Sequence, residues 1–445
     1  MSLMALPEHV RQCMDILSRA GHRVFLVGGC VRDALLGLVP HDFDLCSDAL
    51  PEQKRQLFVG FPLVLTGLKH GTVGVITGGE VVEITTFRTE CGYSDNRHPD
   101  SVAFTGTIEE DLRRRDFTVN AIAWHPDLGF VDPFSGRVDL ERRVLRAVGD
   151  PEKRLQEDSL RILRGVRFAV RFSLTPEENT FRTMEQLAGL MDNLAAERVF
   201  DELCKLIPLV TAADLLRFGR ILAAAIPELD PMLGFDQRCP PHAYDLFTHT
   251  AHVVEAVPPE LPLRWAALLH DVGKIPTFTQ DENGRGHFQG HASVSASMAD
   301  TILRRLKAPT QLREQAVNLI SHHMTRLEPD KKLLRRRLSR MGWNTVQDLL
   351  LLQEADMGSK GTGKPEEMEQ FAIIRHLLEQ IRAENACLTV KDLAGSGRDL
   401  MELGFAPGPA LGKCLDSLLS AVLEETLPND RSALLDAARD TLNRT

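Results

Sequence analysis

Two aspartates one residue apart, Asp42 and Asp44, are the side chains of this sequence best placed to do chemistry. In an extended segment, residues i and i+2 point to the same face, so the two carboxylates would lie side by side. Two like charges that close are costly unless a cation lies between them. Hard oxygen ligands suit Mg²⁺. The spacing predicts a magnesium site, and an acidic turn without a metal is the alternative.

A third carboxylate, Glu83, stands inside the mainly apolar, β-branched run of residues 81–87. Such a carboxylate is seldom buried without a partner. Metals held by three carboxylates can activate an attacking hydroxyl and stabilise a leaving pyrophosphate. We therefore predict a catalytic group of Asp42, Asp44 and Glu83, in which Asp42 and Asp44 hold the metal. Glu83 could instead be a structural acid or one that supports the ligands.

A glycine pair, Gly28 and Gly29, follows a predicted strand over residues 22–27 and precedes a short helical pattern that includes Arg32. Without a Cβ, the backbone can come close to a ligand. Amide groups at the start of a helix could face a phosphate chain. Next to a predicted metal site, the pair indicates metal-assisted nucleotidyl transfer.

A carboxylate and a guanidinium, Asp158 and Arg161, lie in a helical pattern over residues 157–164. Together they offer one acceptor and a fork of donors. Cytosine and adenine present an amino donor beside a ring acceptor, whereas uracil and guanine would leave mismatched groups, each costing about 1–3 kcal/mol when buried. The pair could therefore select C and A without a template. Ordinary ion pairs on a solvated helix are the alternative.

Composition limits the classes of protein that fit. The chain has 445 residues, 43% of them hydrophobic, and a net charge of −10, so it holds two or more domains and is not an overall basic binder of nucleic acid. Its eight cysteines include no C-x-x-C pair, which argues against a zinc knuckle and favours the cytoplasm. We find no signal peptide or membrane-spanning run and expect no membrane partner.

The motifs together resemble the bacterial class II tRNA nucleotidyltransferases, the CCA-adding enzymes of the polymerase β superfamily. The resemblance covers roughly residues 7–210. Its motifs are Val27–Asp33 with Asp42-Phe43-Asp44, Arg114–Ala121, Asp132-Pro133-Phe134 with Gly136, Glu157-Asp158 with Arg161, and Glu197-Arg198 with Glu202.

The resemblance implies a role for each matching residue. Asp42 and Asp44 would bind the metals, and tRNA, CTP and ATP would be the partners. The other implied contacts are to the nucleotide: Gly28, Gly29 and Arg32 to the triphosphate, Arg115, Asp116 and Asn120 to sugar and phosphates or between head and neck, Asp158 and Arg161 to the base, and Arg164 to the triphosphate.

The expected fold is α+β, with a polymerase-β-like mixed-sheet head followed by helical parts. We predict a head over residues 1–140, a base-selecting neck over 141–235, an HD domain over 236–375 and a tail over 376–445. A polar segment, residues 88–100, argues against a member that adds only CC. Addition of A alone, or poly(A) synthesis, remains the alternative.

Histidines gather in the second half of the chain. An adjacent His-Asp on an apolar helix, with distant His and Asp residues, suits a divalent or transition metal. The pattern resembles the HD phosphohydrolase superfamily, so the chain could instead act mainly as a phosphohydrolase, with phosphatase or 2′,3′-cyclic phosphodiesterase activity. The implied ligands are His249, His270, Asp271 and Asp356, with His291 and His322 extending the set to two metals.

Overall fold

The computed structural model describes residues 3–92, 101–239, 243–361 and 365–442. They form two compact units. The first comprises residues 1–210, 217–230 and 305–307, and the second comprises the rest of the chain. The finer division into head, neck, HD domain and tail stays a prediction.

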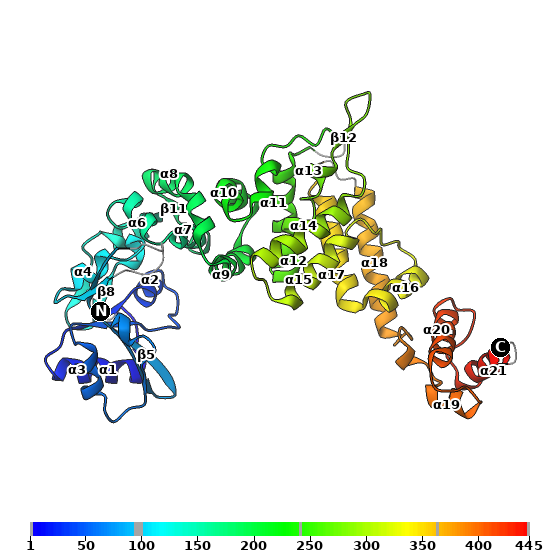
Figure 1. Cartoon of the computed structure of the whole chain (residues 1–445), viewed down its shortest axis with the longest axis horizontal. Coiled ribbons are helices and arrows are strands. Elements are labelled where there is room, and N and C mark those ends of the chain that lie inside the picture. The colour runs from blue at the N-terminus through cyan, green and yellow to red at the C-terminus, as the bar shows by residue number, and fades with distance from the viewer. Residues whose placement is uncertain (1–2, 93–100, 240–242, 362–364, 443–445) are drawn as a thin grey trace. The chain divides into compact units, whose positions relative to one another are not determined.

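A mixed seven-stranded sheet forms the head of the first unit (Figure 1). The strands β2 and β5 pair in parallel, and the other neighbours pair antiparallel. In sheet order the strands are β3 (Leu63–Val64), β4 (Thr72–Thr77), β5 (Glu80–Thr86), β2 (Leu45–Ser47), β1 (Val24–Val27), β8 (Ala123–His125) and β9 (Gly129–Val131). This arrangement confirms the expected α+β fold with a mixed sheet.

The strands β1 and β2 are buried at every position, and all of their residues except Ser47 are apolar. Helix α1 (Glu8–Arg19) buries Val10, Cys13, Met14 and Leu17, which recur on one face of a helix. The hairpin of β6 (Arg88–Cys91) and β7 (Ser101–Phe104) flanks residues 93–100, so part of the predicted 88–100 segment lies outside the described residues. The remaining head helices are α2 (Gly29–Leu35), α3 (Pro51–Leu57) and α4 (Ile108–Arg113).

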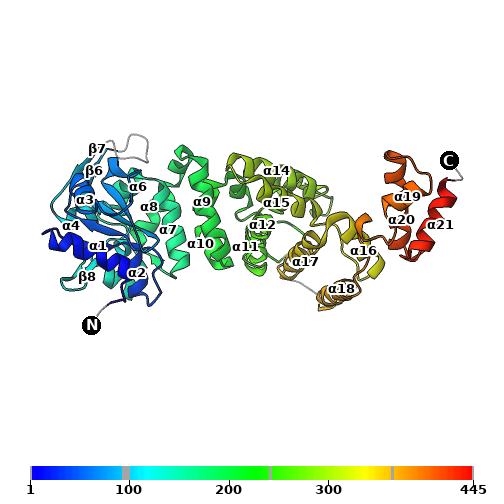
Figure 2. The same cartoon turned by 90° about the horizontal axis from the view of Figure 1, so that it is seen from below.

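Helices follow the sheet along the chain (Figure 2). They are α5 (Gly136–Glu141), α6 (Pro151–Glu157), α7 (Leu160–Arg171), α8 (Glu178–Gln186), α9 (Ala196–Leu206) and α10 (Ala212–Ala225). The expected helix over residues 157–164 is confirmed at Glu157 and from Leu160 onward, but its continuity is wrong, because the chain leaves α6 at Asp158 and starts α7 two residues later. Asp158 has extended backbone angles, and its carboxylate accepts a hydrogen bond from the amide of Leu160, so it caps α7.

The second unit is almost entirely helical. Its main helices are α11 (Leu246–Ala256), α12 (Leu261–Leu269), α14 (His291–Arg305), α15 (Thr310–His322), α16 (Lys331–Met341), α17 (Trp343–Gly358) and α18 (Pro365–Ala383). The last three helices, α19 (Gly397–Glu402), α20 (Pro409–Leu423) and α21 (Arg431–Leu442), pack around their own apolar core. Among the described residues, no helix has the length and apolar character needed to cross a membrane.

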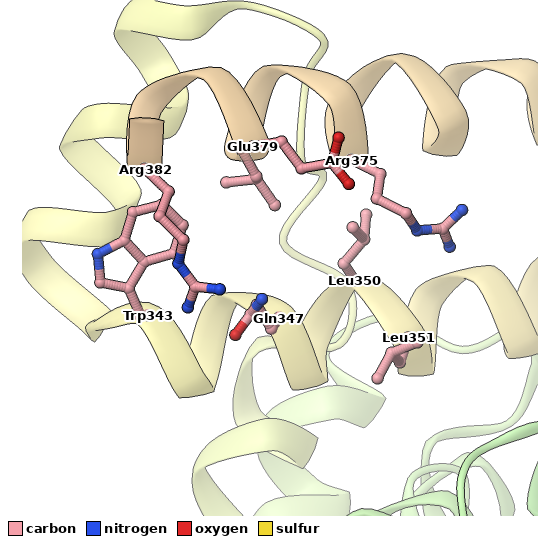
Figure 3. A pocket seen from close by; sticks show the side chains of 8 residues that line it. Trp343, Gln347, Leu350, Leu351, Arg375, Glu379 and Arg382 are labelled. Atoms are coloured by element: carbon pink, nitrogen blue, oxygen red, sulfur yellow. The ribbon is translucent and has the colours of Figure 1, made fainter. Parts of the chain in front are cut away.

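A pocket of about 270 Å³ opens between α17 and α18 (Figure 3). Both of its arginines already have partners, since Arg375 forms an ion pair with Glu354 and the guanidinium of Arg382 lies 4.9 Å from the centre of the Trp343 ring. Leu350 and Leu351 supply apolar lining. We therefore treat this pocket as a feature of helix packing.

Candidate functional site

The three predicted carboxylates line one cavity. Asp42 and Asp44 directly precede β2, and Glu83 lies in β5. In the parallel pairing of these strands Leu45 lies opposite Ile84, so Asp44 and Glu83, one residue earlier in each strand, lie at the same level of the sheet. Asp42, Asp44 and Glu83 line a cavity of about 530 Å³ together with His9 and His41. Residues distant in the sequence thus meet at one open site.

The electrostatics of this cavity suit a cation. The protein atoms around Asp44 raise the pKa of its carboxyl group, Arg115 lowers it, and the charges of Glu83 and Asp42 raise it further. Crowded carboxylates of this kind are stabilised as anions when a metal binds them. Their hard oxygen atoms fit Mg²⁺.

The glycine turn lies beside the same carboxylates. The amide of Val27 donates a hydrogen bond to the carbonyl of Asp44. Gly28 has a φ of 75°, and a Cβ there would lie 3.0 Å from Nη1 of Arg115. A side chain at this position would therefore be strained and would crowd Arg115. The turn brings backbone and the Arg115 guanidinium together next to Asp44.

Arg32 is not exposed in the way expected of a residue that contacts a phosphate. It is buried, its Nη1 donates to Asn120 at 2.6 Å, and its Nη2 donates to Asp33 at 2.7 Å. Its guanidinium also lies 4.2 Å from the centre of the Phe172 ring. In this structure Arg32 braces the turn against the helical part, and contact with a triphosphate would require it to exchange partners.

A chain of hydrogen bonds continues from Arg32 into α7. Asn120 accepts from Arg32 and donates to Asp116 at 2.9 Å, and Asp116 accepts from Arg164 at 2.8 Å. Burial alone would raise the pKa of Asp116, but Arg164 and the hydrogen bonds from Asn120 and Arg164 hold it well below its usual value. Asp116 therefore stays ionised and links sheet and helix.

The depressed pKa of Asp116 predicts a loss of stability in acid. Its ionised form stabilises the fold above its ordinary pKa near 4, and that contribution disappears as the pH falls below this value. We expect wild type to lose about 1 kcal/mol more between pH 5 and pH 3 than Asp116→Asn. Hydrogen exchange of residues 117–123 measures this. Asp127→Asn, at an exposed position, should follow wild type. An Asp116→Asn variant that is equally acid-sensitive would contradict the prediction.

The predicted base-reading residues lie in one region but bind different partners. Arg161 is almost buried and donates to Glu157 at 2.5 Å, whereas Asp158 accepts from Arg198 at 3.1 Å. A base could meet both groups only by replacing these partners. The sequence did not predict the hydrogen bond from Arg198 to Asp158, although Arg198 belongs to the Glu197-Arg198 motif.

Known proteins resemble this chain over its whole length. A CCA-adding enzyme of Levilactobacillus brevis is 34% identical over 99% of this chain and 100% of the relative. The chain belongs to the family of CCA-adding enzymes. A CCA-adding enzyme of Streptococcus mutans is 32% identical, with 100% of both chains covered.

Structural comparison agrees with this family. The solved CCA-adding enzyme of Bacillus stearothermophilus, in complex with CTP, matches with a TM-score of 0.73 and 27% identity over 99% of this chain and 100% of that chain. Three family models also match. They are the poly A polymerase head domain at residues 24–146, the probable RNA and SrmB-binding site of polymerase A at 173–233, and the putative tRNA nucleotidyltransferase domain 2 at 278–438.

A second polar cluster lies in the second unit of this CCA-adding family member. Ligand atoms of His249, His270 and Asp271 lie within 4.8 Å of one another, and so do those of Asp271, His291 and His323. Asp271 is common to both triads. Asp356 approaches His249 at 3.0 Å. Five of the six predicted HD ligands are therefore together.

The expected ligand His322 is wrong, because its neighbour His323 occupies that place. His323 is buried, and its Nε2 lies 3.2 Å from Nε2 of His291. The sequence contains a signal that favours His323 over His322. Ala316, Leu319 and Ile320 are buried on one face of α15, and His323 continues their helical spacing, whereas His322 does not.

The histidines are oriented as metal ligands are. Each directs Nδ1 to a backbone carbonyl, at 3.1 Å for His249, 2.8 Å for His270 and His291, and 2.7 Å for His323. This bond fixes the ring, and in metal sites it accompanies ligation through Nε2. Burial lowers the pKa of His323 to about 4 and also lowers that of His291. Neutral imidazoles are the form that binds metal.

Cations border the same cluster. Lys274 lies 2.7 Å from Asp271, and Lys360 lies 3.7 Å from Asp356. Lys274, Lys360 and Arg285 line a cavity of about 320 Å³ that reaches Asp271, His291, His323 and Asp356. Such a cavity has the groups to bind a phosphate next to a metal.

Proposed function

We propose that this protein adds C and A nucleotides to the 3′ end of tRNA without a nucleic-acid template, using CTP and ATP. The observation that carries the proposal is the convergence of Asp42, Asp44 and Glu83 on one cavity beside the Gly28 turn. Support comes from the relatives named CCA-adding enzymes and from the structure of one of them with CTP. The cytoplasm, where tRNA matures, is the expected compartment.

The reaction is the attack of the tRNA 3′ oxygen on the α-phosphorus of the nucleotide. A new P–O bond forms, the bond to the leaving pyrophosphate breaks, and the hydroxyl proton passes to solvent. Bound Mg²⁺ would supply positive charge for the attacking and leaving oxygens. Asp42 and Asp44 would hold it, with Glu83 as the third carboxylate. Arg115, whose Nη1 lies 3.0 Å from the position of a Cβ on Gly28, would contact the triphosphate.

One assay separates full CCA addition from addition of A alone. Three tRNA substrates ending before the tail, after C and after CC are each incubated with CTP and ATP separately. Full activity incorporates C into the first two substrates and A into the third. Incorporation of A alone into the third identifies an A-adding enzyme, and long A tracts identify a poly(A) polymerase.

Base selection is assigned to Asp158 and Arg161. We expect Arg161→Ala to raise the ratio of UTP to CTP incorporation by about 10-fold or more. In the wild type, uracil would leave buried polar groups unpaired against the Arg161 guanidinium, and this penalty disappears when the guanidinium is removed. Competition between the two nucleotides measures the ratio. Lys153→Ala, at a side chain 82% exposed on α6, should keep the wild-type ratio. An unchanged ratio in Arg161→Ala would remove Arg161 from base selection.

The second cluster supports a second activity, metal-dependent phosphohydrolysis. Four imidazoles and two carboxylates favour a divalent transition metal. Water would attack a phosphate ester, the P–O bond to the leaving hydroxyl would break, and that oxygen would take up a proton. Lys274 and Lys360 border the cavity where the phosphate would lie. A phosphatase or 2′,3′-cyclic phosphodiesterase acting on RNA ends fits this arrangement.

A further inference from the structure

A lysine is completely buried behind the catalytic part of the sheet. Lys54 lies on α3 and is 0% exposed. Lysine is almost never fully buried unless it has partners. Here both hydrogen-bond acceptors are backbone carbonyls, since Nζ donates to Gly71 and to Ile84 at 2.8 Å each. The helix α3 is thus tied from the core side to β5 and to Gly71, the residue directly before β4.

One of the two carbonyls belongs to the strand that carries Glu83. Ile84 is buried and directly follows Glu83, which faces the open side of β5. The same Ile84 pairs with Leu45, the residue after Asp44. The second carbonyl, of Gly71, also accepts the amide of Thr86 from β5. Lys54 therefore holds β5 directly at Ile84 and, through Gly71, at Thr86, immediately after the level at which Glu83 and Asp44 meet.

The amine does not need its charge for this contact. Burial lowers the pKa of Lys54 to about 7, Cys46 on β2 opposes the shift, and Arg88 on β6 adds to it. A neutral amine keeps two N–H donors, which is the number of carbonyls in contact. The tie between helix and strand persists in both protonation states.

We propose that Lys54 is a positioning residue for the metal-binding carboxylates. Its amine fixes the backbone of β5 beside Glu83 and so sets the spacing between Glu83 and Asp44. This inference rests on the metal site of the proposed function. Residues behind metal ligands act in this way, and their loss typically weakens metal binding about 10- to 100-fold.

The test measures metal binding directly, without turnover. Mn²⁺ is titrated into the full chain, free of nucleotide and RNA, and bound ion is followed by electron paramagnetic resonance. The head site is identified as the class of bound Mn²⁺ that Asp42→Ala removes. We expect Lys54→Met, a neutral side chain of similar length, to weaken this class about 10-fold. Hydrogen exchange of residues 81–86 should become faster.

Two further variants distinguish positioning from general packing. Phe58→Leu loosens a fully buried residue directly after α3 without touching either carbonyl, and it should bind Mn²⁺ as wild type does. Lys54→Gln is one atom shorter and cannot reach both carbonyls, so it should also weaken binding and serves if Lys54→Met does not fold. Wild-type affinity in either Lys54 variant, or equal weakening in Phe58→Leu, would overturn the proposal. If Asp42→Ala removes no bound Mn²⁺, the proposed metal site itself fails.

Discussion

Replacing Asp42 with Ala is expected to lower incorporation of CTP and ATP into tRNA by about three orders of magnitude or more. Charge stabilisation by a catalytic metal contributes several kcal/mol, and about 1.4 kcal/mol corresponds to a factor of ten. Asp42 is exposed at the cavity and lies outside the helices and strands, so the variant should fold. Single-turnover incorporation into tRNA ending in CC measures the loss.

The second cluster provides a control within the Asp42→Ala protein. Phosphohydrolase activity from the second cluster should be unchanged in Asp42→Ala, because the ligands of the two sites are different residues. Asp127→Ala, which removes another exposed aspartate of the head, should retain both activities. Incorporation at the wild-type rate in Asp42→Ala would show that the carboxylate cavity is not the site of transfer.

Replacing Asp271 with Ala is expected to remove bound metal and phosphohydrolase activity while leaving nucleotide addition intact. Asp271 belongs to both ligand triads, so one change affects both places where a metal could bind. Elemental analysis of the purified protein measures the metal, and hydrolysis of a 2′,3′-cyclic phosphate measures the activity. Combining it with His270→Ala removes two ligands of one triad.

A matched pair of histidines tests which residues form this site. His323→Ala should lose metal, because its Nε2 lies 3.9 Å from Asp271. His322→Ala changes the adjacent residue, which lies outside the cluster, and should keep the metal. Equal metal content in wild type, His323→Ala and Asp271→Ala would leave the cluster as a structural feature only.

The sheet and its acids were predictable because their signals are local. The β-branched run around Glu83 and the apolar run before Gly28 each specify a strand, and both strands are present. The pairing of β2 with β5 was not predictable in this way. It is a contact between distant segments, and it alone brings Asp44 to the level of Glu83.

Other features of the site could not be predicted from local signals, because neighbouring residues compete for the same role. The apolar spacing around Arg161 favoured one continuous helix, but Asp158 caps α7 and ends that continuity. Between the two adjacent histidines, only helical phase indicates that His323, and not His322, joins the cluster. The burial of Arg32 results from Asp33, Asn120 and two phenylalanines that come from separate parts of the chain.

The parallel pairing of β2 and β5 has a consequence for how the enzyme becomes active during synthesis. Parallel neighbours need a crossover between them, and here β3 and β4 lie within that crossover. Asp44 and Glu83 are about forty positions apart, so closing this loop carries an entropic cost that local contacts do not repay. A nascent head that has already formed β1 and β2 still lacks its third acid. If Glu83 acts as proposed, catalytic competence requires that the ribosome has released the chain through β5.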